Sequence, residues 1–463
     1  MPEIIDDIDF NNELATLLQL DDVALLHSFL DDQNISDIAD WIDENDENAT
    51  TIIATMAMNR AAAVFKLLDS KIQKQIINQL NPTKTAELIN ELPADDRTDL
   101  FELLPSNVVR ELIKTLNFSE RKIALSLLGY PENSVGRLMT PDYVYVYEHD
   151  TVAEVLNTIR RVGKDSETID VLYVINDKGE LLDDIRIREI ILSQPTVKVA
   201  ELMDGRVITL SATDDQEVAN DVFKMNNRVA LPVVSKTNKL LGIVTIDDIL
   251  WVQEEEYSED MQKIGGTEAL DEPYLETPFW KLISKRASWL VVLFIGELFT
   301  ASAMGFYEDS ISKVVVLSML VPLIISSGGN SGSQAATLVI QAMAKGEVLI
   351  TDAWRIFVRE IKSGIVLGSI LGFVGILRTY LWSYIEPSLY GKYTFLLSMV
   401  TFFSVLGVVL WGTLIGSMLP LLLKRLKLDP ATSSAPFVAT LVDVFGIVIY
   451  FSIALLLLGG KLL

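Results

Sequence analysis

The sequence predicts an α-helical membrane protein with five transmembrane helices, joined to a helical-repeat domain and a tandem pair of small α/β units. Three observations support this prediction. The last third of the chain holds five apolar runs long enough to cross a bilayer, which takes about 20 residues. Near the N-terminus, a helix breaker recurs every 12 residues. Between these two regions, one sequence pattern occurs twice, which indicates a duplicated fold.

Charge divides the chain into two parts. Residues 1–280 contain 24 Lys and Arg against 54 Asp and Glu, whereas residues 281–463 contain 14 against 9. An acidic first part should repel nucleic acid and attract cations, although plain solubility explains many acidic surfaces. The chain has no cysteine, so disulfides and thiolate metal sites are excluded. We therefore expect cations, and no nucleic acid, among its partners.

Residues 1–130 are expected to form the helical-repeat domain. A leucine followed by a helix breaker recurs every 12 residues, at Leu80, Leu92, Leu104, Leu116 and Leu128. Proline or another breaker just before each short helix fits a capping position or the first helical residue, and apolar residues at helical spacing lie in between. The result should be a small solenoid of stacked helices, which suits a scaffold or an interaction surface.

Residues 135–252 contain the duplication. The segment RLMT at 137–140 is echoed by ELMD at 201–204, and VLYVINDKGELLDDIRIREII is echoed by ALPVVSKTNKLLGIVTIDDIL. Each half is predicted to run strand, helix, strand, strand, helix. This order, found twice, resembles a pair of CBS domains, a regulatory module that often binds adenosine nucleotides between its halves.

The CBS resemblance implies candidate nucleotide contacts in the second half, at Gly242, Thr245 and Asp248. In the matching pattern, the hydroxyl and the carboxylate contact the ribose and phosphate of a nucleotide, so ATP is a candidate ligand. The first half departs from this pattern, because the corresponding residues are Asp183, Arg186 and Glu189.

Residues 253–280 are expected to form an acidic connecting helix next to the membrane. Five acidic residues fall within two helical turns, from Glu254 to Asp260, and the simplest interpretation is a solvated linker. If this helix faced other carboxylates, such as Asp95, Asp96 and Asp99, repulsion would separate the parts unless cations bridged them. Oxygen ligands suit Mg²⁺ and Ca²⁺ better than softer metals.

Residues 281–463 are expected to form the transmembrane domain. Two of its five apolar runs, the second and the fourth, are so long that tilting or an internal break is expected. The five runs are Ala287–Phe306, Val314–Met343, Ile361–Ile385, Thr394–Leu423 and Phe437–Leu458.

Basic residues in the loops predict the orientation. Ten lie on the side of the N-terminus and four on the opposite side, which places the N-terminus in the cytoplasm and the C-terminus outside. The acidic start, MPEIIDDIDF, has no basic segment followed by an apolar run and is therefore not a signal peptide. A multi-pass protein of the cell (inner) membrane is expected.

Two carboxylates lie well inside the apolar runs, Glu297 and Asp443. A charge at that depth costs about 2.5–3.5 kcal/mol on insertion scales, so it is usually kept for a function. The alternative is a protonated acid bound to a neighbouring helix. Ala439 precedes Asp443 by one helical turn and leaves room beside it.

The second run contains SSGGNSGSQAA at 326–336. Small residues let helices approach closely, while paired glycines could loosen the helix and turn carbonyls toward a cavity. Asn330 and Gln334 share one face and favour a water-filled path.

The order of these parts resembles the MgtE family of Mg²⁺ channels over essentially the whole chain. The carrying motifs are SSGGNSGSQAATL at 326–338 and DPATSSAPFVATLVDVFGIVIY at 429–450. The resemblance implies a homodimer with its pore on the two-fold axis, where Asp443, beside Ala439 and Asn330, binds hydrated Mg²⁺. It also implies uptake of Mg²⁺ and closure by intracellular Mg²⁺. The bridging carboxylates it implies are Asp215, Glu217, Asp248, Glu256, Glu259 and Asp260, with Asp429 at the pore mouth.

Two other functions remain open from the sequence. A proton-coupled secondary transporter would use Asp443 or Glu297 as proton carrier, although five spans show no inverted repeat. A membrane-bound nucleotide sensor without transport is disfavoured by the polar second run. An enzyme is not expected, because no nucleophile, metal-hydrolase or phosphate-loop arrangement appears and His27 and His149 have no evident partners.

Overall fold

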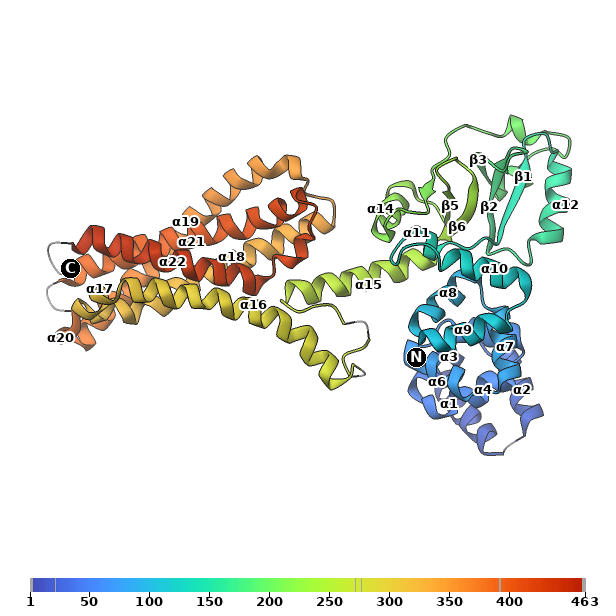
Figure 1. The fold of residues 1–463 in the computed structure, drawn as a ribbon, viewed down its shortest axis with the longest axis horizontal. Helices are drawn as coiled ribbons and strands as arrows, with labels where there is room; N and C mark the ends of the chain where they lie inside the picture. The colour runs from blue at the N-terminus through green and yellow to red at the C-terminus, as the bar shows by residue number, and fades with distance from the viewer. Residues whose placement is uncertain (1–2, 21, 271, 276, 391–392, 460–463) are drawn as a thin grey trace. The chain divides into compact units, whose positions relative to one another are not determined.

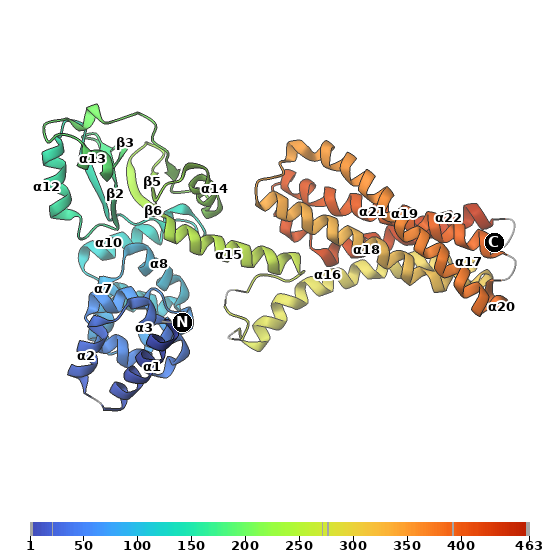
Figure 2. The same ribbon diagram turned by 180° about the vertical axis from the view of Figure 1, so that it is seen from behind.

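The computed structural model describes the chain except residues 1–2, 21, 271, 276, 391–392 and 460–463. The chain forms two compact units, Met1–Gln253 and Glu254–Leu463. Figures 1 and 2 show the helices and strands of both units from opposite sides.

The first unit begins with a helical domain. From residue 70 onward its helices follow the expected period, since α7, α8, α9 and α10 each have 10 residues and start 12 residues apart. The helices are α1 (Glu3–Leu20), α2 (Val23–Asp32), α3 (Ile35–Glu44), α4 (Ala49–Thr55), α5 (Met58–Phe65), α6 (Ser70–Gln79), α7 (Pro82–Glu91), α8 (Ala94–Leu103), α9 (Ser106–Thr115) and α10 (Phe118–Leu127).

The breakers cap these short helices. The side chain of Asn81 accepts a hydrogen bond from the Lys84 amide at 2.9 Å, and Asn117 does the same for the Glu120 amide at 2.9 Å. Pro93 and Pro105 occupy the capping positions of α8 and α9. One apolar core runs through the domain and includes Ile76, Leu88, Leu100 and Phe101. The predicted helical repeat is confirmed.

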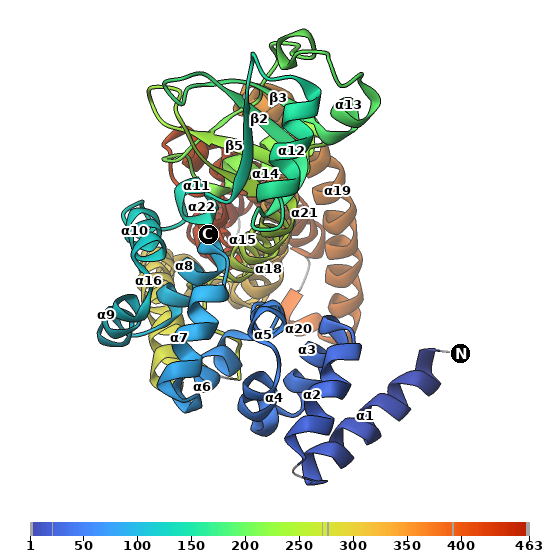
Figure 3. The same cartoon turned by 90° about the vertical axis from the view of Figure 1, so that its right-hand side faces the viewer.

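The rest of the first unit consists of two small sheets with flanking helices, which lie at the opposite end from α1–α6 (Figure 3). In each sheet a parallel pair is followed by an antiparallel pair, with orders β1-β2-β3 and β4-β5-β6. The first half contains α11 (Val135–Leu138), β1 (Tyr143–Tyr147), α12 (Val152–Val162), β2 (Thr168–Ile175), β3 (Leu181–Arg186) and α13 (Ile187–Leu192). The second contains β4 (Leu210–Ser211), α14 (Gln216–Asn226), β5 (Ala230–Val234), β6 (Leu240–Thr245) and α15 (Ile246–Ile264). The predicted duplication is confirmed.

Helix α15 belongs both to the second α/β half and to the acidic connecting segment. It completes the second half of the α/β pair and continues without interruption through the acidic stretch. The expected division at residues 252 and 253 therefore falls inside one helix, because no proline or glycine interrupts 246–264. Glycine then ends it, since Gly266 adopts a left-handed φ of 77°.

Among its described residues, the second unit contains five helices long and apolar enough to cross a membrane. The helices of this unit are α16 (Phe279–Phe306), α17 (Glu308–Lys313), α18 (Val315–Ala344), α19 (Ala353–Ile385), α20 (Pro387–Tyr390), α21 (Thr394–Arg425) and α22 (Ala435–Leu458). Of the two alternatives expected for the long spans, tilting or an internal break, the break is absent, because α18 and α21 are unbroken although they contain Pro322 and Pro420.

Glycines bring α18 and α21 into direct backbone contact. A methyl group on Gly412 would lie 2.3 Å from the Gly328 carbonyl oxygen, and one on Gly416 would lie 2.1 Å from that of Gly332. Each helix thus carries two glycines four residues apart at the same crossing, a packing common between membrane helices. The expectation that the glycines loosen α18 is wrong at Gly328, which is buried in this contact within a continuous helix.

Candidate functional site

Asp443 lies near the middle of α22, whose first turn is firmly held. The Ser434 hydroxyl caps the helix by accepting the Phe437 amide at 3.3 Å, and it also accepts the indole N–H of Trp289 at 3.1 Å. Pro436 stands in the first turn, where a missing N–H costs little. Asp443 follows about two turns further on, among apolar residues.

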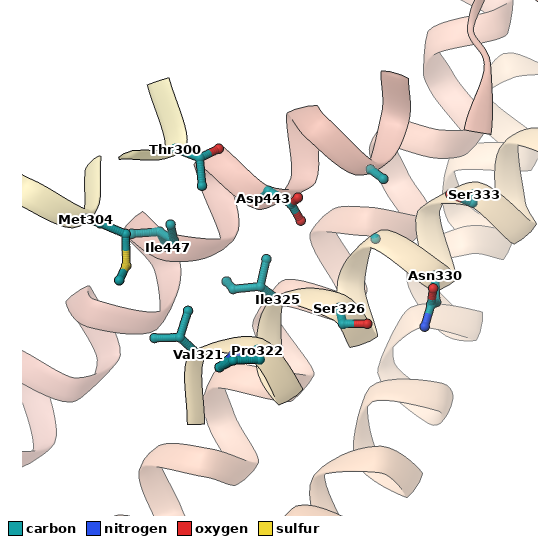
Figure 4. Close-up of a pocket in the computed structure, with 12 residues that line it drawn as sticks. Thr300, Met304, Val321, Pro322, Ile325, Ser326, Asn330, Ser333, Asp443 and Ile447 are labelled. Atoms are coloured by element: carbon teal, nitrogen blue, oxygen red, sulfur yellow. The ribbon is translucent and has the colours of Figure 1, made fainter. Parts of the chain in front are cut away.

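The side chain of Asp443 faces a pocket of about 480 Å³ between α16, α18 and α22 (Figure 4). A cation that keeps six waters needs roughly 180 Å³, at about 30 Å³ for each water. The pocket can therefore hold a hydrated divalent ion. Its lining comprises Thr300, Met304, Val321, Pro322, Ile325, Ser326, Gly329, Asn330, Ser333, Ala439, Asp443 and Ile447.

The structure brings the three predicted pore residues, Asp443, Ala439 and Asn330, into this one pocket. A methyl group on Gly329 would lie 3.5 Å from the Ala439 side chain and 3.8 Å from an Asp443 carboxyl oxygen. Small residues on both helices thus keep the space beside the carboxylate open. Asn330 is exposed in this single chain.

The sequence did not predict that the two carboxylates in the transmembrane helices, Glu297 and Asp443, lie next to each other. The carboxyl groups of Glu297 and Asp443 lie within hydrogen-bonding distance of each other. Both positions were visible as acids in apolar runs, but nothing in their spacing of 146 residues predicts that they meet.

At the end of α15, three of the predicted gating acids meet a lysine. Lys263 contacts Glu259 and donates a hydrogen bond to Asp429 Oδ2 at 2.7 Å. Although burial opposes it, these two carboxylates raise the pKa of the Lys263 ammonium group. Burial, together with repulsion from Asp429, raises the pKa of Asp260 to about 6. The cation between Glu259 and Asp429 is thus the ammonium group of Lys263. The sequence did not predict this role for Lys263.

A second group of acids lies where α8 meets α15 in the first unit. Asp95 is 5% exposed and has a buried oxygen without a hydrogen-bond partner among the described residues. Burial raises its pKa, and the charges of Asp248 and Asp96 raise it further. Burial likewise raises the pKa of Asp96, against the attraction of Lys66, whose ammonium lies 3.6 Å away. We call Asp95, Asp96 and Asp248 the junction acids.

Asp248 is the junction acid that lies in the first turn of α15. Burial raises its pKa to about 7, in spite of a hydrogen bond of 2.7 Å from the Thr245 hydroxyl. Asp247 and Asp96 add repulsion. Because burial and repulsion destabilise the ionised carboxylate, a nearby cation would stabilise it.

Of the remaining predicted acids, Glu256 on α15 is partly buried, and the other three are exposed. Asp99 lies on the outer face of α8, and Glu217 in the first turn of α14. Asp215 caps α14 by accepting the Glu217 amide at 3.0 Å. Within the described part of the chain, no three acidic or histidine side chains form a ready-made metal site.

The nucleotide residues have local structural partners. Gly242 is required by packing, since a methyl group there would lie 2.7 Å from the Thr140 carbonyl oxygen. In the first half, Asp183 is fully buried and accepts the amides of Asp204 and Gly205 at 2.8 and 2.9 Å. A buried carboxylate engaged in this way is structural, which agrees with the departure of the first half from the nucleotide pattern.

Comparison with known proteins adds independent findings. Family models match three regions: MgtE, a divalent cation transporter, at 321–453; the MgtE intracellular N domain at 33–133; and the CBS domain at 135–194 and 199–255. The magnesium transporter MgtE of Thermus thermophilus is 34% identical over 96% of this chain and 98% of its own length. That of Bacillus subtilis is 31% identical over 84% of this chain and 83% of its own length.

Among solved structures, the cytosolic domain of the Mg²⁺ channel MgtE in complex with ATP resembles the first part of this chain. The match covers 52% of this chain and 99% of that domain, with 32% identity and a TM-score of 0.50. The soluble part of a magnesium transporter gives a TM-score of 0.52 at 22% identity, over 54% of this chain and 99% of its own, which supports the fold.

Proposed function

Because this chain belongs to the MgtE family of magnesium transporters, we propose that it conducts Mg²⁺ across the membrane along a path that passes Asp443. The observation that carries the proposal is the pocket that Asp443 faces, with the polar groups of Ser326, Asn330 and Ser333 opposite it. Relatives over nearly the whole chain are named as transporters, so the chain is not an enzyme.

The physics of Mg²⁺ suits this pocket. The ion gives up its water reluctantly and prefers carboxylates that contact its hydration shell. A space of about 480 Å³ with one carboxylate on its wall fits a hydrated ion better than a dehydrated one. We propose a homodimer in which two copies of Asp443 lie around one two-fold axis, because such an interface pairs identical residues.

Flux into liposomes tests the pore. Asp443→Ala should reduce Mg²⁺ uptake by at least tenfold, because the ion loses its charged partner in the span. Asp309→Ala serves as control, since Asp309 is exposed in α17 and does not line the pocket. Unchanged uptake in Asp443→Ala would refute the proposal, and uptake that requires an imposed proton gradient would favour coupled transport.

The junction acids and the end of α15 support closure by internal Mg²⁺. Both sites hold carboxylates with raised pKa values, including Asp248 and Asp260, whose ionised forms a divalent cation would stabilise. Ions that bind one arrangement of the protein more tightly than another shift the equilibrium toward it. We propose that Mg²⁺ at these acids favours a closed state.

ATP is proposed as a further ligand of the first unit. The Thr245 hydroxyl and the Asp248 carboxylate lie together where β6 ends and α15 begins, as the nucleotide pattern requires. Binding of ATP to the purified protein, lost in Thr245→Val, would support this assignment. Equal binding by both would remove it.

We propose that the N-terminus faces the cytoplasm, on the basis of the basic residues in the loops. The absence of cysteine makes this simple to measure. A single cysteine at Lys427 should react with an impermeant reagent only from the inside, and one at Lys313 only from the outside.

A further inference from the structure

Glu297 occupies the face of α16 that turns toward the pocket. It precedes Thr300 by three residues and Met304 by seven, which is the spacing of one helical face. Both of those residues line the pocket, and both appear on its α16 side in Figure 4. Glu297 itself is half-buried. Its position therefore follows from helix geometry as well as from its neighbours.

Close packing of α16 against α22 holds Glu297 next to Asp443. A methyl group on Gly296 would lie 2.5 Å from the methyl carbon of Thr440, so the two helices almost touch at this level. Thr440 is one turn before Asp443 on α22. The contact explains why the carboxyl groups of Glu297 and Asp443 reach hydrogen-bonding distance.

Apart from each other, the two carboxyl groups have no charged partner among the described residues, and one neighbouring hydroxyl has no hydrogen-bond partner there. Among the residues that the structure describes, neither Glu297 nor Asp443 has a lysine or arginine as ion-pair partner. The hydroxyl oxygen of Thr300 is buried without a hydrogen-bond partner in the same described set. In Figure 4 this oxygen lies on the side of Thr300 that faces Asp443. Unpaired polar groups at membrane depth are costly, and a hydrated cation would satisfy them.

We propose that Glu297 is a second carboxylate of the pore ion site, which increases its preference for divalent over monovalent cations. The inference rests on the proposed function, in which Asp443 binds the ion. A unit charge about 6 Å from a divalent ion in water changes binding about tenfold. For a monovalent ion the same energy is halved, which gives about threefold. Removing the charge of Glu297 should therefore lower the divalent preference by about threefold.

The competing interpretation is mechanical, with Glu297 only bracing α16 against α22. Glu297→Gln separates the two, because glutamine keeps the size and hydrogen-bonding ability of the side chain but not its charge. Glu297→Asp keeps the charge. Glu360→Gln is the matched control, since Glu360 is also a half-buried glutamate of a span helix, but its helix, α19, contributes no residue to the pocket, whereas α16 contributes Thr300 and Met304.

The experiment measures uptake into liposomes by the full chain, over a range of Mg²⁺ concentrations and with K⁺ as competitor. In Glu297→Gln, half-saturation should require about tenfold more Mg²⁺ and the Mg²⁺-over-K⁺ preference should fall about threefold. Glu297→Asp should restore most of both, and Glu360→Gln should change neither. Binding of Mg²⁺ to the detergent-solubilised protein should weaken in parallel.

Two results would overturn the inference. The first is a Glu297→Gln protein with unchanged half-saturation and ion preference. The second is a variant that only unfolds at lower temperature, since this indicates bracing. Failure of the proposed function would look different, because then Asp443→Asn would also leave Mg²⁺ uptake unchanged.

Discussion

Asp248 is largely buried and is repelled by two nearby carboxylates, Asp247 and Asp96. Its pKa of about 7 lies above the ordinary carboxyl value of 3.8, so the folded state binds this proton more tightly than the unfolded state. The stabilisation is complete below about pH 4 and is lost as pH rises through about 7. Near neutral pH, the fold of the first unit is therefore sensitive to anything that neutralises this group.

We predict that Asp248→Asn removes much of the pH dependence of the first unit. Without Mg²⁺, the wild-type melting temperature should fall by several degrees between pH 5 and pH 8, whereas the variant should fall clearly less, with a remainder due to the raised pKa values of Asp95 and Asp96. Asp177→Asn is the control, because Asp177 is exposed in the turn between β2 and β3. Calorimetry of the separate first unit provides the measurement. Equal slopes in all three proteins would contradict the role of Asp248.

At the level of single residues, the sequence identified the acids but not their partners. Asp443 was predicted because a charge in an apolar run is rare. Lys263 was not, because a lysine at the end of an acidic helix gives no sign that its partner, Asp429, lies 166 residues away. Contacts between distant segments depend on tertiary packing, which spacing along one helix does not encode.

Regular repeats and apolar runs made the helices and strands predictable. The 12-residue period fixed the short helices of the first domain, and the duplicated pattern gave both sheets. The continuity of α18 was not predicted, because a Gly-Gly pair reads as a weak point in an isolated helix. In the structure, α21 lies so close that the same glycines are needed for packing. Tertiary contact here overrides local preference.

The glycine crossing of α18 and α21 yields a prediction about stability. Gly416→Ala should lower the unfolding temperature in detergent, since its methyl group would lie 2.1 Å from the Gly332 carbonyl oxygen and force the helices apart. The expected cost is about 1–3 kcal/mol. Gly305→Ala is the control, because a methyl group there meets nothing within 4 Å. A Gly416→Ala protein that melts with the wild type would show that the crossing is looser than described.

On the scale of the whole molecule, a strongly acidic part is joined to a weakly basic one. The excess of 54 acids over 24 bases in residues 1–280 is costly without counter-ions, so the state of this part should depend on cation concentration. Lys263 supplies one internal cation at the end of α15. Mg²⁺ from solution would neutralise part of the remaining negative charge.

If Lys263 and Mg²⁺ compete for the same carboxylates, two sets of substitutions should have opposite effects. Replacing Glu256, Glu259 and Asp260 by their amides removes charges that attract Mg²⁺, so closure should require more internal Mg²⁺. Lys263→Met leaves Glu259 and Asp429 without their ammonium group, so Mg²⁺ should bind there more tightly and close the pathway at a lower concentration. The shift should approach tenfold for Lys263→Met, the effect of one charge about 6 Å from a divalent ion, and should exceed about tenfold for the triple variant, which removes three charges.

The measurement is current in excised membrane patches with Mg²⁺ varied at the cytoplasmic face. Lys263→Arg is the control, since it keeps the charge between Glu259 and Asp429 and should close like the wild type. General damage to α15 would move both sets of variants in the same direction, whereas competition between ammonium and Mg²⁺ moves them apart. Shifts of the same sign, or none, would therefore mean that these carboxylates hold α15 in place without sensing the ion.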